Sequence, residues 1–149
     1  MNRNHEKQKI QKPETRRPAR TPRVLCVDDD PAIVAAIEMR LKRYDVQVMG
    51  FFTGMQGYWE AITHRPDLII TDLRMPQGDG TYLLECLKQN PKTSHIPVLV
   101  FSGLRGDDLA ERVKHLGAES LLQKPIRGDE LVQAIARFVD LREKVELTN

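Results

Sequence analysis

The stretch that decides the fold is Leu68-Ile69-Ile70-Thr71-Asp72-Leu73-Arg74-Met75-Pro76. It begins as an apolar run and ends abruptly at one carboxylate, that of Asp72. A short apolar run bounded in this way is typical of a strand that is buried on both faces. Asp72 would then lie at the carboxyl end of the strand, which is the edge where open parallel sheets bind ligands. A carboxylate in such an apolar setting is costly unless it is paired or used, so Asp72 is the first candidate functional residue.

Outward from this stretch, apolar runs alternate with segments whose apolar residues recur at helical spacing. The expected strands are Val24–Val27, Val46–Phe52, Leu68–Thr71, Val98–Phe101 and Ser120–Gln123. This alternation predicts an α/β protein with a parallel sheet. The second and fifth runs contain polar residues, whereas the other three are almost entirely apolar, so the second and fifth should be edge strands. We therefore expect a flavodoxin-like (βα)5 three-layer sandwich with strand order 2-1-3-4-5.

Several residues predict where helices begin and end. Asp30 directly before Pro31 predicts an N-cap followed by proline at the first helical position. Gly117 is expected to end the fourth helix at its C′ position, and Asp129 is expected to cap the last helix. Trp59 lies in the second predicted helix, where we expect it to pack against the sheet or a neighbouring helix.

Charge divides the chain into two parts. Residues 1–22 contain seven basic and two acidic side chains, so this segment is +5 and the rest of the chain, within a total of +2, is −3. The segment is polar and contains three prolines, which predicts a disordered basic tail before a single domain at 23–147. Both cysteines are expected to be buried thiols. No apolar run is long enough to span a membrane and no signal segment is evident, so we expect a cytoplasmic protein without a membrane partner.

Carboxylates also follow the first predicted strand. Asp28 and Asp29 have no capping role, and two adjacent carboxylates repel each other unless a cation neutralises them. In a 2-1-3 strand order they would converge with Asp72 at one edge of the sheet. Three carboxylates in one pocket form a site of hard oxygen ligands, which suits Mg²⁺. The sequence therefore predicts a magnesium site at this edge, although a solvated acidic turn would explain Asp28 and Asp29 taken alone.

The fourth and fifth predicted strands end in groups that suit a phosphoryl ligand. Ser102 ends the fourth strand, and Lys124 ends the fifth. A metal ion and a lysine can neutralise the oxygens of a transferred phosphoryl group, and a hydroxyl can donate a hydrogen bond to one of them. Each residue alone is a weak signal. Their common position at the carboxyl ends of neighbouring strands makes the combination informative.

Together these motifs resemble the receiver domain of response regulators in two-component signal transduction. The motifs are Val27-Asp28-Asp29-Asp30-Pro31, Ile70-Thr71-Asp72-Leu73-Arg74-Met75-Pro76 with Gly78 and Gly80, Phe101-Ser102-Gly103, and Lys124-Pro125-Ile126. The resemblance implies that Asp72 accepts a phosphoryl group from a histidine kinase or phosphotransfer protein. It also implies that Asp29, Asp72 and the backbone carbonyl of Arg74 bind Mg²⁺ directly, and that Asp28 acts through a metal-bound water. Ser102 and Lys124 would contact the phosphoryl oxygens.

The resemblance also implies how the domain would signal. The Lys124–Pro125 bond is expected to be cis, and phosphorylation is expected to shift the 103–108 loop and the fourth helix. A downstream protein, or a second copy in a homodimer, would bind through residues 104–145. Leu121 stands where such domains usually have a switching aromatic residue. Arg74 and Leu104 flank the path of attacking water and offer no base, which predicts slow self-dephosphorylation.

Other functions are compatible with parts of the sequence. The chain would act as a binding module without phosphorylation if the acceptor site were inactive. The basic tail would favour nucleic acid, but we do not expect nucleic acid as the partner. A flavodoxin-like cofactor binder is disfavoured because the first strand-to-helix loop is rich in aspartate instead of glycine. A metal-dependent phosphohydrolase also uses paired aspartates but usually needs a cap or a longer chain. We do not expect an enzyme with turnover.

Overall fold

The computed structural model describes residues 20–74 and 80–147, and within them it forms one parallel five-stranded sheet in the order β2-β1-β3-β4-β5. The strands are β1 (Arg23–Val27), β2 (Gln47–Phe51), β3 (Leu68–Thr71), β4 (Val98–Ser102) and β5 (Ser120–Gln123). The helices are α1 (Pro31–Leu41), α2 (Gly54–His64), α3 (Gly80–Gln89), α4 (Leu109–His115) and α5 (Gly128–Ala136). The predicted flavodoxin-like (βα)5 fold is confirmed, and the strand limits differ from the expected ones by at most one residue at either end.

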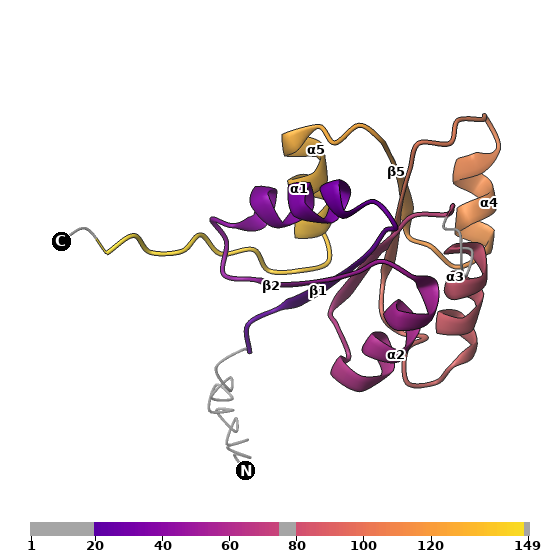
Figure 1. Ribbon diagram of the computed structural model, residues 1–149, viewed down its shortest axis with the longest axis horizontal. Helices are drawn as coiled ribbons and strands as arrows, with labels where there is room; N and C mark the ends of the chain where they lie inside the picture. Colours follow the sequence, from indigo (N-terminus) through magenta and orange to yellow (C-terminus); the bar gives the residue numbers. More distant parts are fainter. Residues whose placement is uncertain (1–19, 75–79, 148–149) are drawn as a thin grey trace, which may run out of the picture.

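Helices cover both faces of the sheet (Figure 1). One apolar cluster lies between the sheet and α2, α3 and α4, and a second lies between the sheet and α1 and α5. Along β1, Leu25 and Val27 belong to the first cluster, while Val24 and Cys26 belong to the second. This alternation follows from the two-residue period of a strand. Strands β3 and β4 are buried along their whole length, whereas β2 and β5 are only partly buried, as expected for edges.

Two predicted helix ends are confirmed and one is corrected. The Asp30 carboxylate accepts a hydrogen bond from the Ala32 N–H at 2.9 Å, and Gly117 has a φ of 103° just after α4. At α5, however, the N-cap residue is Arg127, and its side chain makes no capping bond. Asp129 instead lies inside the first turn, where its negative charge is favourable near the amino end of the helix dipole.

Trp59 is not packed as predicted, because its side chain is 61% exposed. The inner face of α2 carries Gly57 and Ala61, and a methyl group added at Gly57 would press into Val27 of β1. The helix therefore lies close to the sheet on its small residues, and the large indole projects outward. Cys86 also departs from expectation, since it is only partly buried, whereas Cys26 is buried as predicted.

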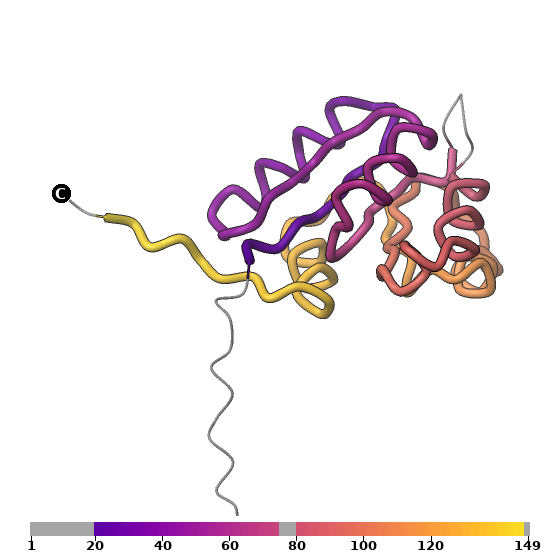
Figure 2. Tube along the Cα trace, turned by 90° about the horizontal axis from the view of Figure 1, so that it is seen from below, coloured from indigo at the N-terminus to yellow at the C-terminus, as the bar shows by residue number. Residues whose placement is uncertain are grey.

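Both ends of the described chain contact the domain. The Arg20 guanidinium pairs with the Asp67 carboxylate at 3.0 Å. After α5, an extended segment forms an antiparallel bridge between Glu143 and Tyr44 in the α1–β2 connection, and Figure 2 shows it continuing away from the domain. Residues 1–19, which contain most of the predicted disordered tail, and the loop residues 75–79 lie outside the described residues. Among the helices of the described residues, none is long and apolar enough to span a membrane.

Candidate functional site

The three predicted metal-binding aspartates come together at the carboxyl ends of β1 and β3. These strands are parallel neighbours, and the Asp72 N–H donates to the Val27 carbonyl at 3.1 Å. Asp28, Asp29 and Asp72 each offer a carboxylate oxygen, and the three oxygens lie within 4.8 Å of one another. Asp28 is 3% exposed and Asp72 is 7% exposed, whereas Asp29 is exposed to solvent. Two of the three carboxylates are therefore held almost out of water.

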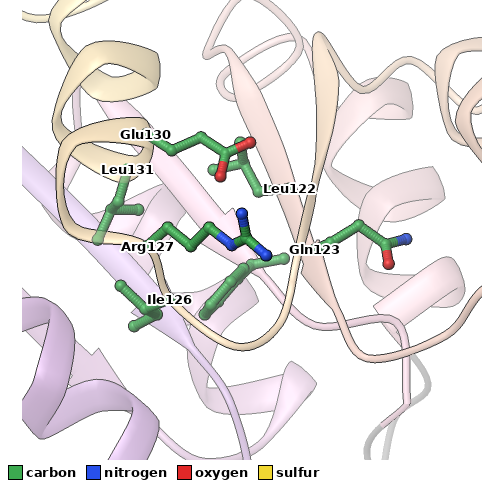
Figure 3. Close-up of a pocket in the computed structure, with 7 residues that line it drawn as sticks. Leu122, Gln123, Ile126, Arg127, Glu130 and Leu131 are labelled. Carbon is green, nitrogen blue, oxygen red and sulfur yellow. The ribbon is translucent and has the colours of Figure 1, made fainter.

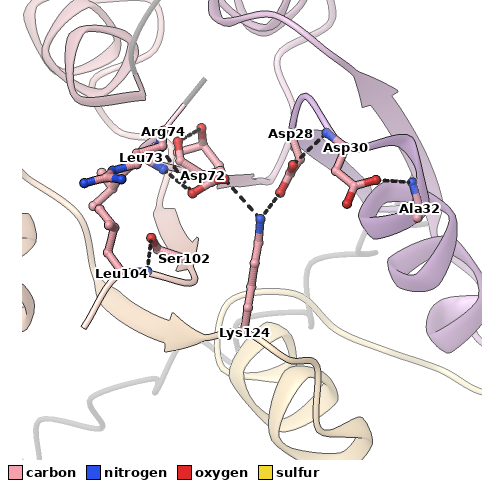
Figure 4. A network of polar contacts seen from close by, with 10 residues as sticks. Asp28, Asp30, Ala32, Asp72, Leu73, Arg74, Ser102, Leu104 and Lys124 are labelled. Atoms are coloured by element: carbon pink, nitrogen blue, oxygen red, sulfur yellow. Dashed lines mark hydrogen bonds and ion pairs between the residues drawn. The ribbon is translucent and has the colours of Figure 1, made fainter. Parts of the chain in front are cut away.

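Lys124 lies between two of these carboxylates (Figure 4). Its Nζ atom is 2.7 Å from Asp28 Oδ2 and 3.0 Å from Asp72 Oδ2. Burial lowers the pKa of Lys124, but its hydrogen bonds to the two carboxylates outweigh this effect, and the net shift is upward. Lys124 is therefore a cation at neutral pH and stabilises the negative charge at the end of β3.

The Lys124–Asp28 pair was not expected from the sequence. From the sequence, we expected Lys124 to contact the oxygens of a phosphoryl group on Asp72, and Asp28 to act through a metal-bound water. The strand order separates β5 from β1 by two strands, but both residues directly follow the carboxyl ends of their strands and meet at the same edge of the sheet. Burial raises the pKa of Asp28 and outweighs the opposing hydrogen bond from Lys124. The ionised form of Asp28 is therefore held in the pocket at a cost in free energy.

The backbone fixes the other oxygen of Asp72. Asp72 Oδ1 accepts a hydrogen bond from the Leu73 N–H at 2.7 Å and a longer one from the Arg74 N–H at 3.4 Å. Helix α3 begins directly against this segment, because the Gly80 N–H donates to the Leu73 carbonyl at 3.0 Å. A side chain at Gly80 would overlap the Asp72 carbonyl group. The absence of a side chain at residue 80 thus allows α3 to support the Asp72 backbone closely.

Ser102 and Lys124 are adjacent across the sheet, as predicted. The Lys124 N–H donates to the Ser102 carbonyl at 2.9 Å, and the Lys124–Pro125 bond is cis. Ser102 is 1% exposed, and its hydroxyl accepts a hydrogen bond from the Leu104 N–H at 3.1 Å. A hydroxyl that accepts one bond keeps its own hydrogen for another acceptor. Ser102 can therefore donate to a further group at this site.

Gln123 is a functional candidate that sequence reasoning missed. Its Nε2 atom donates to the Leu104 carbonyl at 3.0 Å, so Leu104 is held through its N–H by Ser102 and through its carbonyl by Gln123. Leu121, the replacement for the usual aromatic residue, is partly buried against the core. Residues 121 and 123 lie on the same face of β5, because side chains alternate along a strand. This alternation could have indicated Gln123 as a candidate on the face where the aromatic residue is usually found.

The chemistry of the donor set fits a magnesium ion. Carboxylate oxygens are hard ligands, and Mg²⁺ is usually held by a few of them together with water. The burial of Asp28 and Asp72 beside an exposed Asp29 provides both fixed ligands and an open side. Arg74 directly follows this pocket and is exposed, and the role of its carbonyl as a ligand stays a prediction.

Two hollows lie elsewhere among the described residues. A very small one, about 10 Å³, is lined by residues of β4, β5 and α5, and Figure 3 shows Arg127, Glu130 and Leu131 around it. Its volume is about that of one probe sphere, which admits at most a single water. A larger one of about 340 Å³ is lined by residues of the β3–α3 and β4–α4 connections, beside the aspartate pocket.

The family model of the response regulator receiver domain matches residues 24–136. The DNA-binding dual master transcriptional regulator RpaA of Synechocystis is 34% identical over 126 residues, which cover 80% of this chain and 51% of that protein. The polar-differentiation response regulator DivK of Brucella anthropi is 28% identical over 78% of this chain and 94% of its own. The chain spans about half or less of the length of the RpaA regulator and of several other relatives that it matches.

Solved structures agree with this result. The signal receiver domain of a putative Luxo repressor protein from Vibrio parahaemolyticus superimposes with a TM-score of 0.74 at 29% identity, over 78% of this chain and 88% of its own. The fold and the aspartate pocket are those of a signalling module of the α/β class. The chain belongs to the response regulator receiver family. Receiver domains generally bind Mg²⁺ at an acidic pocket and interact with histidine kinases or phosphotransfer proteins.

Proposed function

We propose that this chain accepts a phosphoryl group on Asp72 from a histidine kinase or a phosphotransfer protein, in a reaction that depends on Mg²⁺. The observation that carries the proposal is the convergence of Asp28, Asp29, Asp72 and Lys124 at one edge of the sheet. Such a group of charges is costly to maintain unless it is used, and the pKa shifts of Asp28 and Lys124 are typical of functional sites.

The proposed reaction is a single transfer. A carboxylate oxygen of Asp72 attacks the phosphorus of a phosphohistidine, the P–N bond breaks, and its electron pair returns to the imidazole nitrogen of the donor. The Lys124 ammonium is placed to neutralise a phosphoryl oxygen, and the Ser102 hydroxyl supplies a donor for another. Mg²⁺, held directly by Asp29, Asp72 and the Arg74 carbonyl and through a bound water by Asp28, would supply positive charge to the developing phosphoryl oxygens.

Leu104 offers a route by which the signal leaves the site. If the Ser102 hydroxyl turns toward a phosphoryl oxygen, the Leu104 N–H loses its acceptor, while Gln123 still holds the Leu104 carbonyl. The β4–α4 loop would then rearrange about the β5 edge. In this chain the Gln123 amide would couple loop and strand where other receivers use an aromatic side chain. The element biased by phosphorylation would be the 103–108 loop together with α4.

We propose residues 23–147 as the receiver and residues 1–22 as a basic tail, with Arg20 and Pro22 attached to the domain through Asp67 and Gln47. The partner that reads the phosphorylated state would contact residues 104–145, either as a different protein or as a second copy. These surfaces include α4, β5 and α5, which all follow the Leu104 connection in the chain.

Intact mass spectrometry after incubation with a small acyl phosphate tests the proposal. We expect one added phosphoryl group on the wild type with Mg²⁺, none without Mg²⁺, and none on Asp72→Asn. A circular dichroism spectrum of the variant shows whether the fold is intact. An adduct on folded Asp72→Asn would contradict the assignment of the acceptor. If the wild type binds a beryllofluoride–Mg²⁺ complex but gives no adduct, the site requires its own kinase. If it binds neither, the chain is a receiver-like module that acts without phosphorylation.

A further inference from the structure

The larger hollow of about 340 Å³ lies directly beside the aspartate pocket but has the opposite charge. One wall is Arg74, which follows β3, and the other wall is the β4–α4 connection with the first turns of α4. Its lining consists of Arg74, Leu104, Arg105, Gly106, Asp107, Asp108, Leu109 and Arg112. Three of these residues are arginines, Arg74 on one wall and Arg105 and Arg112 on the other, and with the two aspartates the lining has a formal charge of +1.

The three guanidinium groups are available for a ligand. Arg74, Arg105 and Arg112 are exposed, and no hydrogen bond or ion pair joins their side chains to any group in the described part of the chain. By contrast, Arg20 and Arg142 each pair with an aspartate. An unpaired guanidinium presents up to five donors in a planar fork that matches a carboxylate. Three such groups around one hollow form an unsatisfied receptor for anionic groups.

We propose that this hollow binds acidic side chains of a partner protein. The half-buried Leu104 and the buried Leu109 offer apolar surface for the methylene groups of a glutamate, while the arginines hold its carboxylate. A volume of about 340 Å³ is at the lower end of small-molecule sites and accommodates a few side chains. This binding site is separate from the proposed phosphoryl site, and the unphosphorylated chain should already bind the acidic side chains.

An acidic peptide fits the hollow better than nucleic acid does. Asp107 and Asp108 lie in the same lining and would repel a continuous row of phosphates, whereas separate carboxylates can avoid them. The chain outside residues 1–22 is also net negative, by three charges. A polyanion such as a duplex is therefore repelled by the domain as a whole, and only a local, spaced set of acidic groups is favoured.

The two walls of the hollow are bonded to the two sides of the proposed phosphoryl site. The Arg74 N–H donates to Asp72 Oδ1, and the Leu104 N–H donates to the Ser102 hydroxyl. An acidic side chain that draws the walls together therefore shifts groups that also position Asp72 and Ser102. By linkage, phosphorylation would change the affinity of the hollow for the peptide by the same factor as the peptide changes binding at Asp72.

The test uses the full chain, unphosphorylated, and a blocked Glu-Ser-Glu-Ser-Glu peptide, whose carboxylates are spaced, followed by NMR titration of backbone amides. We expect shifts at Arg74, Leu104 and Arg112, and binding about tenfold weaker in Arg105→Gln/Arg112→Gln. Asp107→Asn/Asp108→Asn should bind the peptide a few times more tightly, because the repulsive charges are removed. The control Arg137→Gln/Arg142→Gln removes two charges that follow α5 in the chain and lie outside the lining of the hollow, and it should bind like the wild type.

Three results would overturn the proposal. If Arg105→Gln/Arg112→Gln and the control Arg137→Gln/Arg142→Gln lose the same amount of peptide binding, the peptide is attracted by net charge alone. Shifts at the same amides with inorganic phosphate but none with the peptide would identify a small-anion site. Stronger binding of a DNA duplex than of the spaced glutamate peptide at these amides would make nucleic acid the ligand. Because all arms use unphosphorylated protein, failure here leaves the proposal for Asp72 untouched, and the intact-mass experiment fails or succeeds separately.

Discussion

The aspartate pocket and the arginine-lined hollow are neighbours that differ in how their charges are satisfied. In the pocket, Asp28 and Asp72 are buried, and every carboxylate oxygen of these two residues has a hydrogen-bond donor. In the hollow, the guanidinium groups are exposed and without partners among the described residues. Buried, fully paired charges suit chemistry that needs fixed geometry, whereas exposed charges on a loop suit recognition of a partner that brings its own countercharge.

The largest expected effect on the aspartate pocket comes from a substitution at Gly80, where α3 packs against the Asp72 backbone. We expect Gly80→Ala to lower the free energy of unfolding by about 2–3 kcal/mol, because the new methyl group would force α3 away from the Asp72 backbone. Urea unfolding measures the change. The matched control is Gly103→Ala, since nothing lies within 4 Å of a methyl group added there. Equal stability of the two variants would show that the close approach of α3 is not a constraint.

Arg74 and Leu104 adjoin both the aspartate pocket and the arginine-lined hollow. Replacing them should alter the lifetime of the phosphoryl group on Asp72. In Arg74→Asn/Leu104→Glu, a carboxylate and an amide replace groups that cannot orient an attacking water. We expect self-dephosphorylation about tenfold faster than in the wild type, as a modest case of general base catalysis. Loss of the mass adduct with time gives the rate. Equal lifetimes would mean that these residues do not line the water path.

Replacing Asp28 tests how much the buried carboxylate charge lowers the free energy of unfolding. Burial raises its pKa, so the ionised carboxylate destabilises the folded protein above that pKa. We expect Asp28→Asn to raise the free energy of unfolding at pH 7 by about 1 kcal/mol while it weakens Mg²⁺ binding. The gain should shrink as the pH falls through the raised pKa toward 3.8, where the carboxyl is neutral in both states.

Urea midpoints between pH 4.5 and 7 follow this change. Asp29→Asn serves as the control, because the Asp29 side chain is exposed and its replacement should change stability by less than about 0.5 kcal/mol. A loss of stability in Asp28→Asn at neutral pH would show that the bond to Lys124 outweighs the burial of the carboxylate, contrary to the direction of its pKa.

The smallest expected effect concerns Gln123, which connects the Leu104 loop to β5. A glutamate at this position keeps the shape but replaces the amide donor with an acceptor that cannot bond to the Leu104 carbonyl. We expect Gln123→Glu to change the apparent affinity for beryllofluoride and Mg²⁺ by a few times, with the Leu104 amide as the NMR probe. Gln123→Asn, which keeps the donor, should show a smaller change. Unchanged affinity in both would remove Gln123 from the signalling route.

The sequence predicted the strands, their order and the aspartate pocket because apolar runs mark buried strands and each run ends at its functional residue. It did not predict the outward position of Trp59, because that follows from the close packing of Gly57 against Val27. The Lys124–Asp28 pair joins residues that follow two non-neighbouring strands, so it depends on how the ends of these strands meet in the folded sheet. The arginine-lined hollow joins residues from separate connections, whose meeting is a property of the folded chain alone.

The central claim is that three neighbouring carboxylates have different roles and that Asp72 alone accepts the phosphoryl group. Borohydride reduction converts an aspartyl phosphate to homoserine, so reduction after treatment with an acyl phosphate and Mg²⁺, followed by peptide mapping, identifies the acceptor. We predict homoserine at residue 72 and unmodified aspartate at residues 28 and 29. Homoserine at residue 28 or 29 in the wild-type chain would contradict the account, because the acceptor would then be a carboxylate that is assigned to Mg²⁺ binding alone.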